Sequence, residues 1–318
     1  MYKVAIVMFV TIFIWVFSLP LLFLTSVLWL PLGSALITGC TAFSMWVQWH
    51  HQDDIIVDSV WRDMIACIKL RTWFESYTVH WKGESFIPKN SLIIAHPHGI
   101  LCCGMLIYHF ENKYTVMAVA PILFYVPIFG WLARSWGLIP ATDFMIRKAL
   151  KEGHSVILYI GGVEELIATC ERQLYIQPRW GYLKIINDLK INVISVWVKG
   201  EYDTFMSPPL PLLQLRQRLV KYVKVGIMFP WIFGWNSIWM PRAVKLDVYV
   251  NNCGVTELST LESIKGWYHA HLRQTIAQAY ASEPQAKAYH SAQVPLIPFQ
   301  ETHRRSPNLE GLYLQKSC

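Results

Sequence analysis

The pattern of hydrophobic and polar positions opens with a long uncharged run. From Val4 to Trp49 the chain contains no Asp, Glu, Lys, Arg or His. A helix rises about 1.5 Å per residue and a bilayer core is about 30 Å thick, so this run is long enough for two crossings. Pro20 and Pro31 interrupt it, and proline breaks a helix. The run therefore predicts an N-terminal membrane hairpin of two apolar helices within residues 1–50.

The charges that flank the run indicate its orientation. Lys3 is the only early positive charge, Arg62 and Lys69 follow the run, and the turn between the two segments has no Lys or Arg. Positive residues favour the cytosolic side, so both ends should face the cytosol. A cleaved signal peptide is disfavoured, because a second apolar segment follows the first at once. The pattern leaves open whether the hairpin crosses the bilayer or stays within one leaflet.

After the hairpin, short apolar runs alternate with helical patterns. The predicted strands are Ser91–Ala95, Thr115–Val119, Ser155–Ile160, Asn192–Val198 and Lys245–Val250. The predicted helices cover residues 143–152, 181–189 and 261–281. Continuously apolar strands are typical of a buried parallel sheet. The order predicts one α/β domain over residues 51–282, with a mostly parallel sheet and helices on both faces, followed by a polar tail over residues 283–318.

Composition narrows the class of protein. Hydrophobic residues make up 54% of the 318 and charged residues only 15%, against about 25% in an ordinary soluble domain. This excludes a disordered chain, a collagen and a small disulfide-stapled domain. The seven cysteines form no C-x-x-C pair, so no metal or redox motif is supported. The net charge of +7 fits an anionic membrane surface or a phosphate-bearing substrate, and we expect no nucleic-acid partner.

The first candidate site is His96-Pro97-His98-Gly99, directly after the strand Ser91–Ala95. Ligands of α/β proteins bind at the carboxyl ends of strands. Pro97 suits the first turn of a following helix, whose N-terminus would keep His98 neutral and able to accept a proton. Gly99 would let a ligand approach closely. Two alternatives remain: a metal-binding histidine pair, for which the chain offers no third ligand at a recognised spacing, and a hydrogen-bonded structural pair.

The second candidate site is Gly161-Gly162-Val163-Glu164-Glu165, directly after the strand Ser155–Ile160. The two glycines free the turn, and the carboxylates follow where a helix could begin. Acids favour a helix N-terminus for electrostatic reasons alone, which is the structural alternative. In the functional interpretation, Glu165 lies on the same sheet edge as His98, orients its imidazole and stabilises its cationic form.

These motifs resemble the type-two diacylglycerol acyltransferase family, which includes monoacylglycerol and wax-alcohol acyltransferases, and particularly its plant members. The resemblance covers the chain from about Trp73 to Val250 and has four blocks in the family's order. They are His96 to Gly99, Gly137 to Thr142, Gly161 to Glu165, and Arg179 to Tyr182. It departs from the family at Tyr77-Thr78-Val79, where a Tyr-Phe-Pro element is usual, and at Trp180, where a second basic residue is usual.

Related glycerolipid acyltransferases also carry an Asp five residues after the catalytic His. Here Cys103 holds that place relative to His98, and Leu101 holds it relative to His96. Glu165 is therefore the expected substitute for the missing acid. The departures put the choice of acceptor in question more than the type of reaction.

The resemblance implies an acyl-CoA-dependent O-acyltransferase with a glycerolipid acyltransferase-like fold. Acyl-CoA would be a co-substrate, with no cofactor and no metal. The implied catalytic residues are His98, Glu165 and His96. The implied substrate-binding residues are Pro97, Gly99, Gly161, Gly162, Arg179 and Gly181. Arg179, with Arg147 or Lys184, is a candidate for the CoA phosphates.

The implied acceptor is a neutral lipid, with diacylglycerol favoured because it gives triacylglycerol. Monoacylglycerol, a long-chain alcohol or a lysophospholipid are the alternatives, and a lipid-binding scaffold with an idle site is the non-enzymatic one. The resemblance places the protein at the endoplasmic reticulum membrane, or at the lipid-droplet surface, with its site facing the cytosol. It says nothing of the oligomeric state.

Overall fold

The computed structural model describes the body of the chain and parts of its N-terminal region. The described residues are 38–39, 41–43, 45–46, 49–51, 53–57, 59–83, 85–126, 129–162, 165–166, 181–205 and 241–281. Most of the predicted hairpin and the whole predicted tail lie outside them. Within the described ranges, no helix has both the length and the hydrophobicity that a membrane crossing requires.

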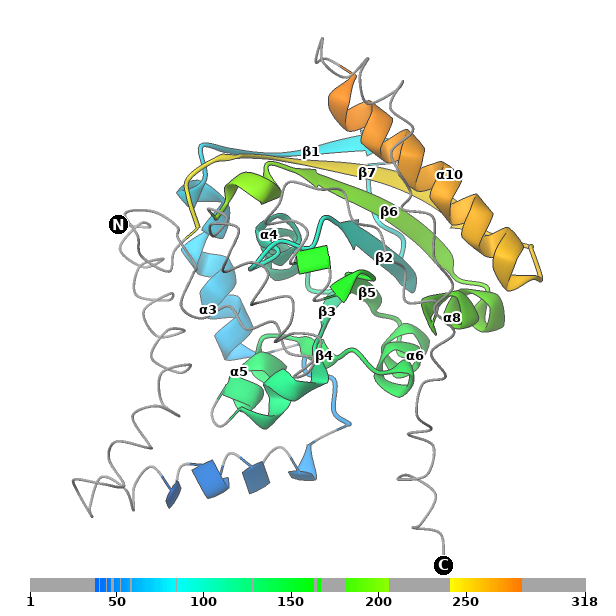
Figure 1. Cartoon of the computed structure of the whole chain (residues 1–318). Helices are drawn as coiled ribbons and strands as arrows, with labels where there is room; N and C mark the ends of the chain where they lie inside the picture. The colour runs from blue at the N-terminus through cyan, green and yellow to red at the C-terminus, as the bar shows by residue number, and fades with distance from the viewer. Residues whose placement is uncertain are drawn as a thin grey trace, which may run out of the picture.

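A seven-stranded sheet forms the centre of the molecule, with the order β1-β7-β6-β2-β5-β3-β4 (Figure 1). The strands are β1 (Ser76–Lys82), β2 (Ser91–His96), β3 (Thr115–Val119), β4 (Leu138–Pro140), β5 (Ser155–Leu158), β6 (Asn192–Lys199) and β7 (Lys245–Val255). All neighbouring strands pair in parallel except β6 and β7. The predicted α/β class with a mostly parallel sheet is confirmed.

Helices cover both faces of the sheet. The helices are α3 (Val60–Ile68), α4 (Cys103–Glu111), α5 (Phe129–Ser135), α6 (Asp143–Lys151), α8 (Gly181–Leu189) and α10 (Leu261–Tyr280). Three short 3-10 turns join them, and these are η1 (Leu70–Trp73), η2 (Pro121–Tyr125) and η3 (Glu201–Asp203). One hydrophobic cluster lies beneath α3, α4 and α5, and a second lies beneath α6, α8 and α10. The sheet is therefore buried on both sides, as its apolar strands predict.

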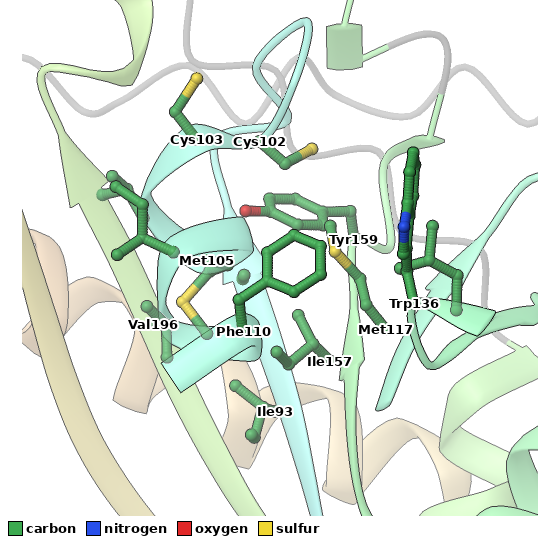
Figure 2. Close-up of a cluster of buried hydrophobic side chains, with 14 of the residues drawn as sticks. Ile93, Cys102, Cys103, Met105, Phe110, Met117, Trp136, Ile157, Tyr159 and Val196 are labelled. Atoms are coloured by element: carbon green, nitrogen blue, oxygen red, sulfur yellow. The ribbon is translucent and has the colours of Figure 1, made fainter. Parts of the chain in front are cut away.

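The first cluster fills the space between α4 and the middle of the sheet (Figure 2). Ile93, Ile157 and Val196 project from three adjacent strands toward Met105 and Phe110 of α4. Each of the three strand residues is fully buried. Burying such a side chain stabilises the fold by about 1.5–3 kcal/mol, so this cluster fixes α4 on the sheet.

Local signals explain the helix boundaries that the sequence predicted well. Thr142 caps α6, because its hydroxyl accepts a hydrogen bond from the Met145 N–H at 3.3 Å. Gly153 follows α6 with φ +93°, a conformation that glycine adopts without strain. Thr260 caps α10 in the same way by accepting from Ser263 N at 3.2 Å.

Several elements differ from the prediction. Strands β1 and β4 and helices α3 and α5 were not predicted, and the helix expected after Pro97, which is α4, begins later than expected, at Cys103. β1 alternates polar and apolar residues and is only partly buried, unlike the continuous runs of the inner strands, and β4 has three residues. β5 ends at Leu158 rather than at Ile160, because the chain turns there toward Gly161.

A buried arginine joins α3 to the end of α4. Arg62 is 1% exposed, and its Nη2 donates to the carbonyl oxygens of His109, Asn112 and Thr115 at 2.8, 2.8 and 2.9 Å. These carbonyls lie at or just beyond the C-terminus of α4, where a positive charge complements the helix dipole. One side chain of α3 thus supplies a charged donor to three carbonyls around the end of α4, in addition to the backbone N–H groups that the His109 and Asn112 carbonyls accept.

Replacing Arg62 should therefore destabilise the protein strongly. We expect Arg62→Met to lower the free energy of unfolding by about 3 kcal/mol or more, since three carbonyls each lose a hydrogen bond from a buried charged donor. Chemical denaturation in detergent measures the change. Arg71→Met is the matched control, because Arg71 forms a solvent-exposed ion pair with Glu111, which also lies at the end of α4. It should cost less than about 1 kcal/mol. Equal losses in the two variants would contradict this account of Arg62.

Candidate active site

Three adjacent parallel strands bring the candidate residues to one edge of the sheet. β2 lies between β5 and β6, and all three end at the same edge. The motif His96 to Gly99 follows β2, and Gly161 follows β5. A third segment, Gly200-Glu201, follows β6 at the same edge. The fold therefore brings the first two motifs to the same edge of the sheet, as the sequence predicted.

His98 lies in the loop between β2 and α4 and is partly buried. Its Nδ1 is 2.8 Å from the carbonyl oxygen of Gly99. A carbonyl only accepts hydrogen bonds, so Nδ1 must carry the proton. In the neutral ring, Nε2 is then an acceptor. The loop itself holds His98 in the tautomer that a general base requires.

Burial keeps the imidazole of His98 neutral. Desolvation lowers the pKa of His98 below its ordinary value of 6.5, while the nearby charge of Glu165 raises it. The expected cause was a helix N-terminus, but α4 begins only at Cys103, and its N-cap is Cys102. His98 therefore precedes the helix, and removal from water accounts for its lowered pKa.

His96 and Glu165 form a buried pair beside this loop. The His96 Nδ1 is 2.7 Å from a carboxylate oxygen of Glu165, and the two residues are 0% and 1% exposed. Glu165 lies in the helical turn that begins at Gly162 after β5, as the sequence predicted. His96 is the last residue of β2. A charge-assisted bond of this kind is strong and geometrically specific.

This pairing corrects the expectation that Glu165 binds His98. Side chains alternate along a strand, so His96 shares a face with Leu92 and Ile94, which pack beneath α6, α8 and α10. The two histidines thus have different surroundings, although only Pro97 separates them. Glu165 still acts on His98 through space, because its charge raises the pKa of that imidazole.

The glycines of both motifs make room for carboxylates. A side chain added at Gly161 would overlap Glu165, and one added at Gly99 would overlap Glu201. Gly99 was expected to admit a ligand, whereas the structure fills that space with a protein side chain. Gly162 has φ +56°, in the region that favours glycine.

The remaining predicted site residues contribute less to this geometry. Pro97 is buried in the loop, and its carbonyl accepts the Gly99 N–H at 3.0 Å. Gly181 is the first residue of α8, with open space around its Cα. Arg179 lies outside the described residues. Arg147, another basic candidate for phosphates, binds the carboxylates of Asp143 and Asp188 at 2.7 and 2.8 Å.

Sequence reasoning missed Glu201. It is 1% exposed, and its carboxylate accepts the backbone N–H groups of Cys103 and Gly104. The sequence did hold a signal for it, since Gly200-Glu201 directly follows the apolar strand β6, just as Gly161 and Glu165 follow β5. Across the described part of the chain, His, Cys, Asp and Glu form no group of three that could hold a metal ion.

Comparison with known proteins agrees with the motifs. Residues 79–199 match the protein family described as Acyltransferase. Human 2-acylglycerol O-acyltransferase 3 is 29% identical over 133 residues, which is 37% of this chain and 39% of that protein. Human diacylglycerol O-acyltransferase 2-like protein 6 is 26% identical over 147 residues, 41% of this chain and 43% of that protein.

Residues 79–199 thus carry an acyltransferase domain, and the chain is similar to monoacylglycerol and diacylglycerol acyltransferases. The resemblance to type-two diacylglycerol acyltransferases is confirmed by relatives of that type. The mouse diacylglycerol O-acyltransferase 2-like protein 6 extends the match to 218 residues at 22% identity, covering 60% of this chain and 59% of the relative. The matches thus span about two fifths to three fifths of these relatives' lengths.

The chain also aligns with a solved structure of an acyltransferase. The 1-acyl-sn-glycerophosphate acyltransferase of Thermotoga maritima aligns with a TM-score of 0.44 and 14% sequence identity. The alignment covers 84% of this chain and 97% of that one.

The through-space effect of Glu165 on His98 can be measured directly. Glu165→Gln keeps an oxygen that can accept from His96 but removes the negative charge that favours the His98 imidazolium. We therefore expect the pKa of His98 to fall further below 6.5 in this variant. NMR titration of labelled histidine in detergent, with the signal assigned by His98→Ala, measures the change. The control Asp188→Asn removes a carboxylate that binds Arg147 on the surface and should leave this titration unchanged. An unchanged pKa in Glu165→Gln would contradict the coupling.

Proposed function

We propose that the protein is an acyl-CoA-dependent O-acyltransferase whose acceptor is the hydroxyl of a neutral lipid, with diacylglycerol favoured. The observation that carries the proposal is the 2.8 Å contact between His98 Nδ1 and the Gly99 carbonyl oxygen, from which the tautomer follows. The Nδ1–H of His98 is committed to the Gly99 carbonyl, so Nε2 is left with the lone pair that a general base needs. The match of residues 79–199 to the acyltransferase family suggests the class of reaction, and this geometry suggests the residue that would perform it.

The reaction follows from this arrangement. Nε2 of His98 takes the proton of the acceptor hydroxyl, and the alkoxide oxygen attacks the thioester carbonyl carbon of acyl-CoA. The tetrahedral intermediate collapses as its C–S bond breaks, and the CoA sulfur takes the proton back from the imidazolium. The Glu165 carboxylate favours that imidazolium electrostatically. The thioester is already activated, so the proposed reaction uses no cofactor.

His96 has a supporting part in this proposal. It is fully buried and fixes the Glu165 carboxylate through the 2.7 Å hydrogen bond. It thereby holds a negative charge close to His98 without itself meeting substrate. Arg179 remains the proposed contact for the CoA phosphates, since Arg147 is already neutralised by two carboxylates.

The membrane supplies the acceptor in this proposal. The uncharged run before residue 50 would form the hairpin, and exposed apolar side chains continue from it onto the body of the protein. Phe43, Trp46 and Trp49 are 65%, 55% and 71% exposed, and Val60 of α3 is 74% exposed. Aromatic residues of this kind favour the membrane interface. We place the protein at the endoplasmic reticulum membrane or the lipid-droplet surface, with the site on the cytosolic side.

The activity test supplies labelled acyl-CoA and a panel of acceptors to membranes that contain the protein. The panel holds diacylglycerol, monoacylglycerol, a long-chain alcohol and a lysophospholipid. We expect a labelled product from diacylglycerol, and a loss of about 10²–10⁴-fold in His98→Ala, because the general base is removed. His80→Ala is the matched control, since His80 lies on the edge strand β1 and binds Asp247 of β7.

Each contrary outcome of this assay has a definite meaning. No product above the His98→Ala background with any acceptor would refute the enzyme proposal and favour a lipid-binding scaffold. Product from another acceptor alone would correct the substrate. Loss of activity in His96→Ala with full activity in His98→Ala would assign the base to His96.

The hairpin proposal predicts that the full chain resists extraction from membranes at alkaline pH. Integral segments stay in the membrane pellet under these conditions, whereas peripheral proteins enter the supernatant. Ile12→Arg/Ile14→Arg places two charges within the first apolar segment, each costing about 2.5–3.5 kcal/mol at a bilayer centre. This variant should shift toward the supernatant. Complete release of the unaltered chain would exclude the hairpin.

A further inference from the structure

A second buried carboxylate lies on the other side of the loop that carries His98. Glu201 begins η3, immediately after Gly200, which has φ +93° and whose added side chain would overlap the Lys245 carbonyl. This turn directs Glu201 back toward the sheet edge, where it is 1% exposed. Burying a carboxylate is costly unless hydrogen bonds offset the loss of water. The hydrogen bonds of Glu201 therefore indicate which part of the structure this residue stabilises.

Both carboxylate oxygens of Glu201 bind the start of α4. One accepts the Cys103 N–H at 2.8 Å and the other accepts the Gly104 N–H at 3.0 Å. The first N–H groups of a helix have no partner within it, so the Glu201 oxygens satisfy two of them. Burial raises the pKa of Glu201 to about 7, while these two hydrogen bonds lower it. The N-cap residue, Cys102, makes no side-chain capping bond. Glu201 thus caps α4 from a distant part of the sequence.

Glu201 also packs against the loop itself. A side chain at Gly99 would coincide with the Glu201 carboxyl group, so Glu201 occupies the side-chain space of Gly99. Gly99 does not have the left-handed φ that would require glycine, and the contact with Glu201 is therefore the reason that residue 99 must be small. The carbonyl of the same Gly99 accepts the Nδ1–H of His98. Gly99 therefore connects the carboxyl group of Glu201 to the imidazole of His98.

We propose that Glu201 is a positioning residue, which holds the loop from Pro97 to Gly104 so that the Gly99 carbonyl keeps His98 in its Nδ1–H tautomer. This inference rests on the proposed function, in which His98 is the general base. Glu201 acts through the backbone and does not touch the reacting atoms. Without it, the start of α4 loses its cap and Gly99 loses the contact that fixes its carbonyl.

Two carboxyl groups therefore share the role of an acid near His98. Glu165 supplies charge from the β5 side, and Glu201 supplies position from the β6 side. The backbone of Cys103, which stands where related acyltransferases carry an Asp, is bound by Glu201. A carboxyl group thus contacts position 103 from the segment that follows β6.

A double-mutant cycle between Gly99 and Glu201 tests the proposal. We expect Gly99→Ala and Glu201→Ala each to lower kcat by about 10²-fold, the effect of a small displacement of a catalytic group. KM for acyl-CoA should change by less than about threefold, because substrate binding is not altered. In the double variant the added methyl group meets no carboxylate, so its kcat should equal that of Glu201→Ala alone. Losses that multiply would overturn the proposal.

A readout independent of activity separates this proposal from the proposed function. The ¹⁵N chemical shifts of His98 distinguish its tautomers, and the unaltered protein should show the Nδ1–H form. Glu201→Ala should show a mixture, and so should Glu201→Gln, whose amide N–H₂ group would face a backbone donor. Glu201→Gln preserves side-chain size and serves if Glu201→Ala does not fold. A persistent Nδ1–H form in a folded Glu201 variant would refute the positioning role, whether or not any acceptor is acylated.

Discussion

Buried carboxylates govern the edge of the sheet where β6, β2 and β5 end. A carboxylate that leaves water needs hydrogen-bond donors, and each of the two here finds them in a different part of the segment from His96 to Gly104. Glu165 binds the imidazole of His96, whereas Glu201 binds the backbone at the start of α4. Each also occupies the space that a side chain at a nearby glycine would fill. Glu165 occupies this space at Gly161, and Glu201 occupies it at Gly99. The geometry of the loop between them follows from these constraints.

Strand alternation explains why two neighbouring histidines have separate roles. His96 belongs to β2 and points into the layer beneath α8 and α10, where it is fully buried. His98 lies beyond the strand end, packs 5.0 Å from the ring of Tyr159 and retains partial exposure. A buried histidine can fix a charge but cannot meet a lipid hydroxyl. The partly exposed histidine can do so, provided that its tautomer is fixed.

The sequence predicted most of the inner sheet, because continuous apolar runs and capping residues are local signals. β3 and α8 have the predicted bounds, and β2 differs by a single residue. The edge strand β1 was missed because its alternating residues resemble a surface loop. The start of α4 was expected too early because it is capped by Glu201 rather than by a neighbour in the sequence. The partner of Glu165 depends on which face each histidine occupies, which only the exact end of β2 determines.

The position of the exposed apolar surface bears on how an insoluble acceptor could reach His98. η2 directly follows β3, so it lies at the same sheet edge as the candidate site, and its Ile122 and Tyr125 are 48% and 67% exposed. Trp131 of α5 packs edge-on against Trp61 of α3 at 5.7 Å, which continues this surface to the element that follows the uncharged run. Exposed aromatic groups next to a site are costly in water and stable at a lipid interface. A surface that meets lipid here would bring the acceptor hydroxyl to the sheet edge without moving it through water.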